Sequence, residues 1–183
     1  MYSISKILFI SILALVIINT DLEWAATKFA ASAGYIGAIL CFGMGGYGTA
    51  RGVQIISKAV AGACIKTPQI AFKAMVGTIV CEANFMFSLF GTYAIISALA
   101  NNQSSVTTGL IKSQLLFAAG ILIGSASYTS SLCTAIVCSS VTIMDSKDRT
   151  LFSKLVIVEL LGGSIGVFGF VIGYLLKSRV DDL

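Results

Sequence analysis

Residues 74–100 read AMVGTIVCEANFMFSLFGTYAIISALA, an apolar run that is long enough to cross a bilayer as one helix. The run carries a single charged residue, Glu82, near its middle. A charge at the centre of a membrane helix costs roughly 2.5–3.5 kcal/mol on insertion scales, so we expect this carboxyl to be neutral or to meet a partner. Intramembrane acids often serve proton pathways; the alternative is an inert acid that hydrogen-bonds a neighbouring helix.

The composition is that of an integral membrane protein. Of the 183 residues, 57% are hydrophobic and 11% are charged, and the mean hydropathy is +0.95. The net charge of +4 comes from Lys and Arg that lie mostly between apolar runs, where they set membrane orientation, and no nucleic-acid partner is expected. Histidine is absent and the cysteines lack metal-ligand spacing, so we expect apolar packing residues and no metal site, cofactor or disulfide framework; they are Cys41, Cys64, Cys81, Cys133 and Cys138.

The first 29 residues predict an extra N-terminal helix. Residues 7–19 form a short apolar core between Lys6 and Asp21, an arrangement close in form to a secretory signal peptide. We favour a retained transmembrane helix, which is short for a full span unless flanking residues or neighbouring helices complete it.

Two later runs carry small residues along one helical face. In lipid, small side chains let helix backbones approach closely, so both stripes predict tightly packed inner helices. In the run from Ala30 to about Val60 the stripe is Gly34, Gly37, Cys41, Gly45, Gly48 and Gly52. In the run from Leu115 to Met144 it is Gly120, Gly124, Ser127, Ser131 and Cys138.

These elements form an internal repeat. Each small-residue helix is followed by a polar turn and then by an apolar helix with one acid, Glu82 in the first unit and Glu159 in the second. The turns are expected over residues 61–73 and 145–150, and a polar loop over 101–114 joins the units. The sequence therefore predicts an all-α membrane protein with five transmembrane helices, arranged as an N-terminal extra helix (1–29) and two antiparallel helical hairpins (30–100 and 115–176).

Basic residues indicate the orientation of the chain. Five spans put the two ends of the chain on opposite sides of the membrane, and the side with more Lys and Arg is expected to be cytosolic. The N-terminus and both hairpin turns share Lys6, Lys58, Lys66, Lys73, Lys147, Arg149 and Lys154, against Lys28, Lys112, Lys177 and Arg179 on the other side. The excess places the N-terminus and the turns in the cytosol and the C-terminus in the lumen.

From about Gly34 to the C-terminus the chain resembles the proteolipids of V-type ATPases, most of all the longer c double-prime type, which has an additional N-terminal helix. The resemblance rests on four stretches, of which the last is the most specific: GYIGAILCFGMGGYGTARG (34–52), IKTPQIAFK (65–73), IVCEANF around Glu82, and LFSKLVIVELLGGSIGVFGFVIGYLL (151–176) around Glu159.

This resemblance implies a subunit of a rotor ring that carries protons on a mid-membrane carboxyl, matched here by Glu82. The implied partners are other c-type proteolipids in the ring, a static a subunit with its arginine, the d subunit and central stalk of the soluble ATPase sector, and membrane lipid. A vacuolar or other endomembrane location is implied. The sequence has no GxxxxGK[ST] phosphate-binding loop, so we expect a subunit that hydrolyses no ATP itself.

The faces around the two acids differ. Helical spacing from Glu159 meets only small residues, which invite a close neighbour, so we expect this acid to be enclosed; they are Gly162, Gly166, Gly169 and Gly173. Spacing from Glu82 meets bulky residues suited to lipid and to a static subunit, namely Phe85, Met86, Leu89 and Tyr93. We predict that Glu82 is the main proton carrier and that Glu159 is either a second, less accessible carrier or a packing residue.

Arg51 has two interpretations. It lies about as far before the Pro68 turn as Glu82 lies after it, so a hairpin places the two at similar depth. Arg51 is either a counter-charge to an acid in the membrane or, as we prefer, a side chain that faces the central space of the ring and helps to hold lipid or the first helix there.

Two other functions compete with the rotor. A small proton-coupled exporter would use a membrane Glu to exchange protons for a cationic drug, and duplicated helices would suit it. A structural channel-forming or junctional protein with four spans is the third interpretation. Central acids in both outer helices and small-residue stripes in the inner ones favour the rotor.

Overall fold

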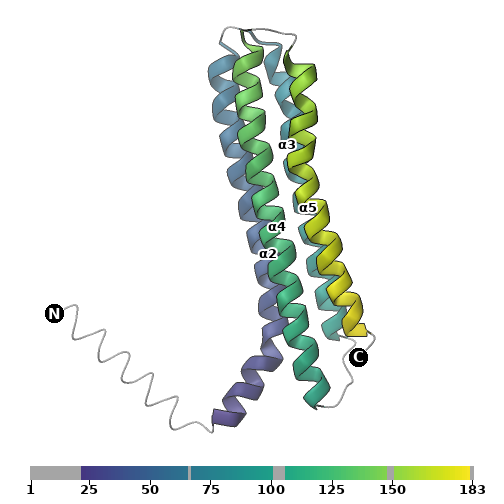
Figure 1. The fold of residues 1–183 in the computed structure, drawn as a ribbon. Coiled ribbons are helices and arrows are strands. Elements are labelled where there is room, and N and C mark those ends of the chain that lie inside the picture. The colour runs from purple at the N-terminus through teal and green to yellow at the C-terminus, as the bar shows by residue number, and fades with distance from the viewer. Residues whose placement is uncertain (1–21, 66, 101–105, 148–150, 182–183) are drawn as a thin grey trace, which may run out of the picture.

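The structure, a computed structural model, describes residues 22–65, 67–100, 106–147 and 151–181. These residues form four long helices and no strand: α2 (Leu22–Ala63), α3 (Ile70–Ala100), α4 (Val106–Asp145) and α5 (Leu151–Asp181). The helices lie side by side along most of their length (Figure 1). Residues 1–21, most of the predicted extra helix, lie outside the described residues.

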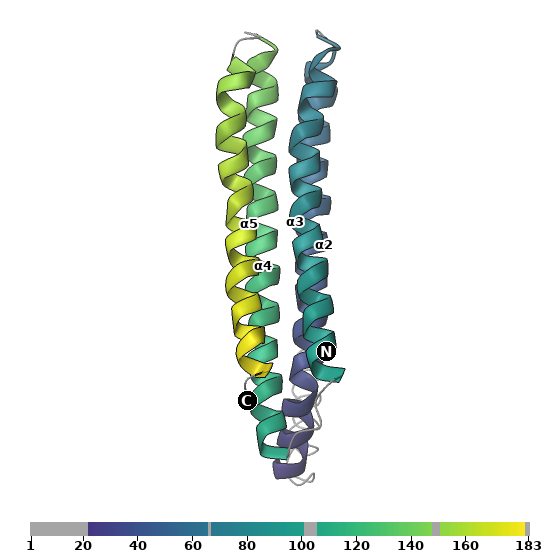
Figure 2. The same ribbon diagram turned by 90° about the vertical axis from the view of Figure 1, so that its right-hand side faces the viewer.

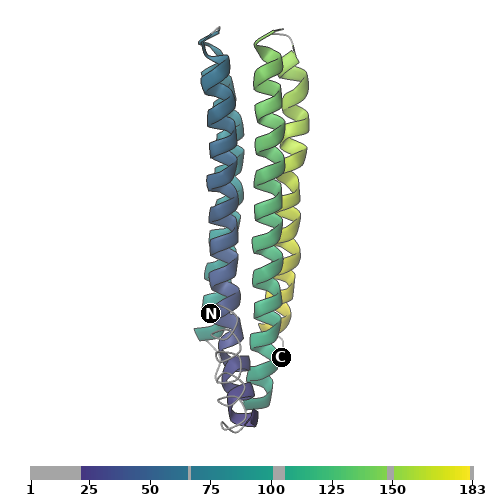
Figure 3. The same ribbon diagram turned by 90° about the vertical axis from the view of Figure 1, so that its left-hand side faces the viewer.

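The helices are arranged as two hairpins, α2–α3 and α4–α5, which stand next to each other (Figure 2). Both hairpin turns lie at one end of the bundle, and α5 ends at the other (Figure 1). Helices α2 and α4 run parallel (Figure 3) and have the most extensive contact of any two described helices, whereas the backbones of α2 and α5 do not approach each other within the described residues.

Several helix boundaries differ from those predicted. α2 starts at Leu22 rather than Ala30, α4 starts at Val106 inside the predicted loop, and α5 continues past Leu176 to Asp181. Hydropathy marks where a helix is apolar, whereas a helix ends where the backbone is broken or capped, and none of these three extensions contains a proline. The polar ends of the helices therefore extend beyond the apolar runs.

Three of the described helices contain segments long and apolar enough to cross a membrane: Ile70–Ala100, Gly109–Asp145 and Val156–Val180. The glycine-rich α2 is not among them. The structure thus supports part of the predicted membrane architecture, and the count of five spans stays a prediction.

Glycines allow the backbones of α2 and α4 to touch. A Cβ atom added at Gly37 would lie 2.6 Å from the Cα atom of Phe117, and one added at Gly48 would lie 2.7 Å from the Cα atom of Tyr128. Such distances leave no room for any side chain, and a shift of backbone cannot be made locally in a packed helix pair. These two glycines allow α2 and α4 to lie at their close spacing.

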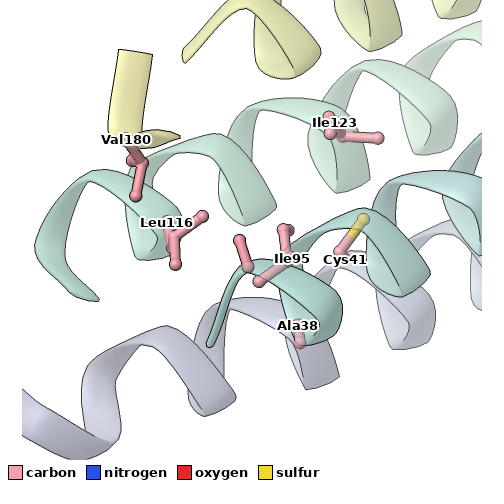
Figure 4. Packing of buried hydrophobic residues seen from close by; sticks show 7 residues of the cluster. Ala38, Cys41, Ile95, Leu116, Ile123 and Val180 are labelled. Atoms are coloured by element: carbon pink, nitrogen blue, oxygen red, sulfur yellow. The ribbon is translucent and has the colours of Figure 1, made fainter. Parts of the chain in front are cut away.

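The largest apolar cluster draws on all four helices at the end away from the hairpin turns. It contains Ala38, Cys41, Ile95, Ala98, Leu116, Ile123 and Val180 (Figure 4). All five cysteines are free thiols, and Cys41, Cys81 and Cys138 are buried. The three buried cysteines fill small spaces between helices, as their apolar settings in the sequence indicate.

Candidate functional site

Glu82 lies on the surface of α3. Its side chain is exposed, as are Met86 and Tyr93 further along the helix, at 51% and 75%. Phe85 and Leu89 are partly buried, and the Phe85 ring packs on Phe42 of α2 with 5.6 Å between ring centroids. The carboxyl of Glu82 is therefore presented outward from a membrane-length helix, beside bulky apolar side chains.

Glu159 of α5 lies inside the bundle. It is 1% exposed, and neither carboxyl oxygen has a hydrogen-bond partner in the part of the chain that the structure describes. The carboxyl packs against Gly77 of α3 beside the Cys138 thiol of α4, because a Cβ atom added at Gly77 would overlap both Cys138 Sγ and Glu159 Oε1. A carboxylate in such a setting has nothing to offset the loss of its hydration, so the neutral acid is the form that fits.

The glycines that follow Glu159 face neighbouring helices. Gly162 lies against Cys133 and Thr134, Gly166 against Asn84, Gly169 against Ala126 and Gly173 against Ile123. All four glycines are buried. Close approach along this stripe is what encloses Glu159.

The two acids lie at different levels of the bundle. α3 and α5 run in the same direction, and their contacts pair Gly77 with Glu159, Val80 with Gly163, and Asn84 with Gly166. This register puts Glu82 five to six residues beyond Glu159 along the bundle, or about 8 Å at the rise of a helix. The offset arises largely because Glu82 follows the start of α3 by 12 residues, whereas Glu159 follows the start of α5 by 8.

A buried polar layer joins α3, α4 and α5 next to the acids. Asn84 Nδ2 donates to Ser130 Oγ at 2.9 Å, and Ser130 Oγ donates to the carbonyl oxygens of Gly162 and Gly163 at 2.8 and 3.1 Å. Ser127 Oγ donates to the Asn84 carbonyl oxygen at 2.7 Å. Asn84 was not among the site residues predicted from the sequence. The signal that could have identified it is a polar amide within an apolar run, on the helix face opposite Glu82.

An ion pair that was likewise not predicted ties α3 to α4 at the hairpin-turn end. Lys73 Nζ contacts both carboxyl oxygens of Asp145 at 2.9 Å. The Asp145 side chain is 1% exposed and that of Lys73 is 34% exposed. Each residue was assigned to a polar turn, so no sequence signal indicated that the two turns face each other.

Arg51 does not pair with Glu82. Its Nη1 atom donates to Gln54 Oε1 at 2.8 Å on the exposed side of α2. The two residues lie at similar levels, since Thr49 Oγ1 donates to the Cys81 carbonyl oxygen at 3.2 Å. A direct Arg51–Glu82 counter-charge is therefore not part of this structure.

No group of three or more His, Cys, Asp or Glu side chains suited to a metal ion occurs among the described residues.

Comparisons with known proteins agree with this architecture. The c'' subunit of the V-type proton ATPase of Saccharomyces cerevisiae is 28% identical over 151 residues, which are 80% of this chain and 70% of that protein. The c''2 subunit of the V-type proton ATPase of Arabidopsis thaliana is 29% identical over 147 residues, which are 79% of this chain and 83% of that protein. The resemblance to V-type ATPase proteolipids is confirmed.

A family model that describes the C subunit of ATP synthase matches residues 36–93 and 117–176, which take in the greater part of both hairpins. Together the two segments are more than half of the chain. The chain therefore belongs to the family of the ATP synthase C subunit.

Proposed function

We propose that this chain is a proton-carrying subunit of the rotor ring in the membrane sector of a V-type ATPase, and that Glu82 carries the proton. The observation that carries the proposal is the exposure of Glu82 on a membrane-length helix. An acid on this surface can meet lipid and a static subunit in turn, whereas an acid inside the bundle cannot.

The two environments give Glu82 two protonation states. Against hydrocarbon, a charged carboxylate is too costly, so the neutral acid turns with the ring. Beside a water-filled half-channel and the fixed arginine of a static a subunit, the opposite charge favours the carboxylate and the proton leaves. Moving one proton against the membrane potential costs about 2.3 kcal/mol per 100 mV, and ATP hydrolysis in a separate soluble sector supplies this work.

Glu159 takes a packing role in this proposal. Its burial against Gly77 and Cys138 and the glycine stripe beyond it keep the carboxyl away from any half-channel. The remaining partners are other c-type proteolipids, the d subunit and the central stalk. The protein is placed in an endomembrane with its hairpin turns in the cytosol, on the side that the excess of Lys and Arg indicates.

A matched pair of substitutions tests the proposal. Glu82→Gln and Glu159→Gln each keep the shape of the side chain and remove its proton-carrying acid. In vesicles that contain the whole complex, we expect Glu82→Gln to assemble normally but to abolish ATP-driven acidification, and Glu159→Gln to retain most of it. Co-purification with the complex reports assembly. Normal acidification by assembled Glu82→Gln complexes would falsify the proposal.

A further inference from the structure

The rotation of α3 about its own axis decides whether Glu82 faces outward. The buried residues of α3 recur every three or four positions and form one stripe: Ile70, Ala74, Gly77, Cys81, Asn84, Ser88, Gly91, Ile95 and Ala98. Lipid tails are as apolar as most of these side chains, so the hydrophobic effect does not select which face of such a helix turns inward. Packing and the polar groups of the stripe, Asn84 and Ser88, must therefore fix the rotation of α3.

The amide of Asn84 is held between α4 and α5. Asn84 is 2% exposed, and its Nδ2 atom donates to Ser130 Oγ at 2.9 Å. Its carbonyl oxygen accepts a second hydrogen bond, from Ser127 Oγ at 2.7 Å. Gly166 of α5 leaves room for the amide, because a Cβ atom added there would lie 2.6 Å from Asn84 Oδ1. α4 therefore supplies the partners of Asn84, and α5 supplies the space.

Ser88, one turn further along the stripe, constrains the rotation of α3 less than Asn84 does. Its Oγ atom donates to the Cys41 carbonyl oxygen of α2. A serine hydroxyl that loses such a partner can donate instead to a carbonyl oxygen three or four residues back in its own helix. The amide of Asn84 has two donor hydrogens and an acceptor oxygen, so it loses more than a hydroxyl when it is turned into hydrocarbon.

Glu82 lies almost directly opposite Asn84 on α3. The two residues are two positions apart, which puts their side chains about 200° apart around the helix, and Glu82 is exposed where Asn84 is buried. Turning α3 by one side-chain step, about 100°, would take the amide away from Ser130 and carry Glu82 toward α2 or α5, which both contact α3. The hydrogen bond of Asn84 and the outward position of Glu82 therefore require the same rotation.

We propose that Asn84 is a positioning residue for Glu82. Its amide, bound to Ser130, holds α3 in the rotation that points the Glu82 carboxyl away from the bundle. Asn84 does not touch the proton; it acts through the helix that both residues share. The consequence for proton transport rests on the proposed function, whereas the direction of Glu82 is a property that can be measured without transport.

The test removes each side of the hydrogen bond and measures the access of lipid to Glu82. In the complex that contains the full chain, a carbodiimide that attacks protonated acids from lipid labels Glu82, and peptide mass spectrometry gives the rate. We expect labelling to be about fivefold slower in Asn84→Leu and in Ser130→Ala, the population change for one hydrogen bond of ordinary net strength. The double variant should be no slower than Asn84→Leu, because both changes remove the same bond.

Ser131→Ala is the matched control. Ser131 is as buried as Ser130, but its Oγ atom has no hydrogen-bond partner in the part of the chain that the structure describes, so Glu82 should be labelled at the wild-type rate. A merely structural role of Asn84 would loosen the bundle and speed the labelling of Glu159, which we expect to stay unchanged.

Three results would overturn the proposal: unchanged labelling of Glu82 in Asn84→Leu and Ser130→Ala, an equal loss in Ser131→Ala, or faster labelling of Glu159 without slower labelling of Glu82. If Asn84→Leu fails to assemble, Ser130→Ala against Ser131→Ala decides. Failure of the proposed function has a different sign, namely normal acidification by Glu82→Gln, and leaves these labelling rates as they are.

Discussion

The surroundings of Glu82 and Glu159 are opposite, although both acids lie in the second helix of a hairpin. Glu82 stands on the outside of α3 beside Met86 and Tyr93, whereas Glu159 is enclosed against Gly77 and Cys138. The comparison teaches that a repeated acid does not imply repeated surroundings. Small residues beside an acid bring a neighbouring helix onto it, and bulky residues leave it open to another molecule.

The largest effect is expected where Glu159 is enclosed. In Gly77→Val the new Cβ atom would overlap Cys138 Sγ and Glu159 Oε1, so we expect a loss of about 3 kcal/mol in the free energy of unfolding, the upper end of overpacking costs. Ala83→Val, on the exposed side of α3 beside Glu82, should stay within about 0.5 kcal/mol. Thermal unfolding of the purified protein in detergent measures both, and similar values would remove the contrast between the two regions.

A smaller effect on the free energy of unfolding is expected at the Lys73–Asp145 ion pair. This pair joins α3, which carries Glu82, to α4, which helps to enclose Glu159. Asp145→Asn removes the buried negative charge that Lys73 contacts, and we expect a loss of about 2 kcal/mol in the free energy of unfolding. The cost is below that of a fully buried pair because the one-third exposed Lys73 can turn toward water. Unfolding by heat is again the measurement, with Lys147→Gln as the exposed control. An unchanged unfolding temperature in Asp145→Asn would show that this pair does not hold α3 against α4.

The smallest effect concerns chemical access to the two carboxyls. Dicyclohexylcarbodiimide reacts with protonated acids that are open to lipid, so it should modify Glu82 about tenfold faster than Glu159, a difference of about 1.4 kcal/mol in the free energy of access. Peptide mass spectrometry after timed labelling gives the two rates. Equal or reversed rates would refute the difference in accessibility.

Much of the fold could be predicted from the chain. Apolar runs of membrane length and glycines at helical spacing predict the helical class and the order of the hairpins. Each acid lies within one of these runs, so its helix could be predicted as well. Helix ends were less predictable, because segments of mixed polar and apolar residues, 22–29 and 106–114, continue the helices outside the long apolar runs. The difference in exposure between the two acids could also be predicted, because it depends on side chains three and four residues away on the same helix.

Contacts between helices were beyond the sequence. The roughly 8 Å offset between the acids, the Asn84–Ser130 hydrogen bond and the Lys73–Asp145 ion pair all depend on the axial register between the hairpins. That register is set by the packing of many small side chains along the whole α2–α4 interface, because all of them must fit together at once. The sequence by itself determined which residues share a helix face, because helical periodicity is local; the tertiary structure alone decided what each face meets.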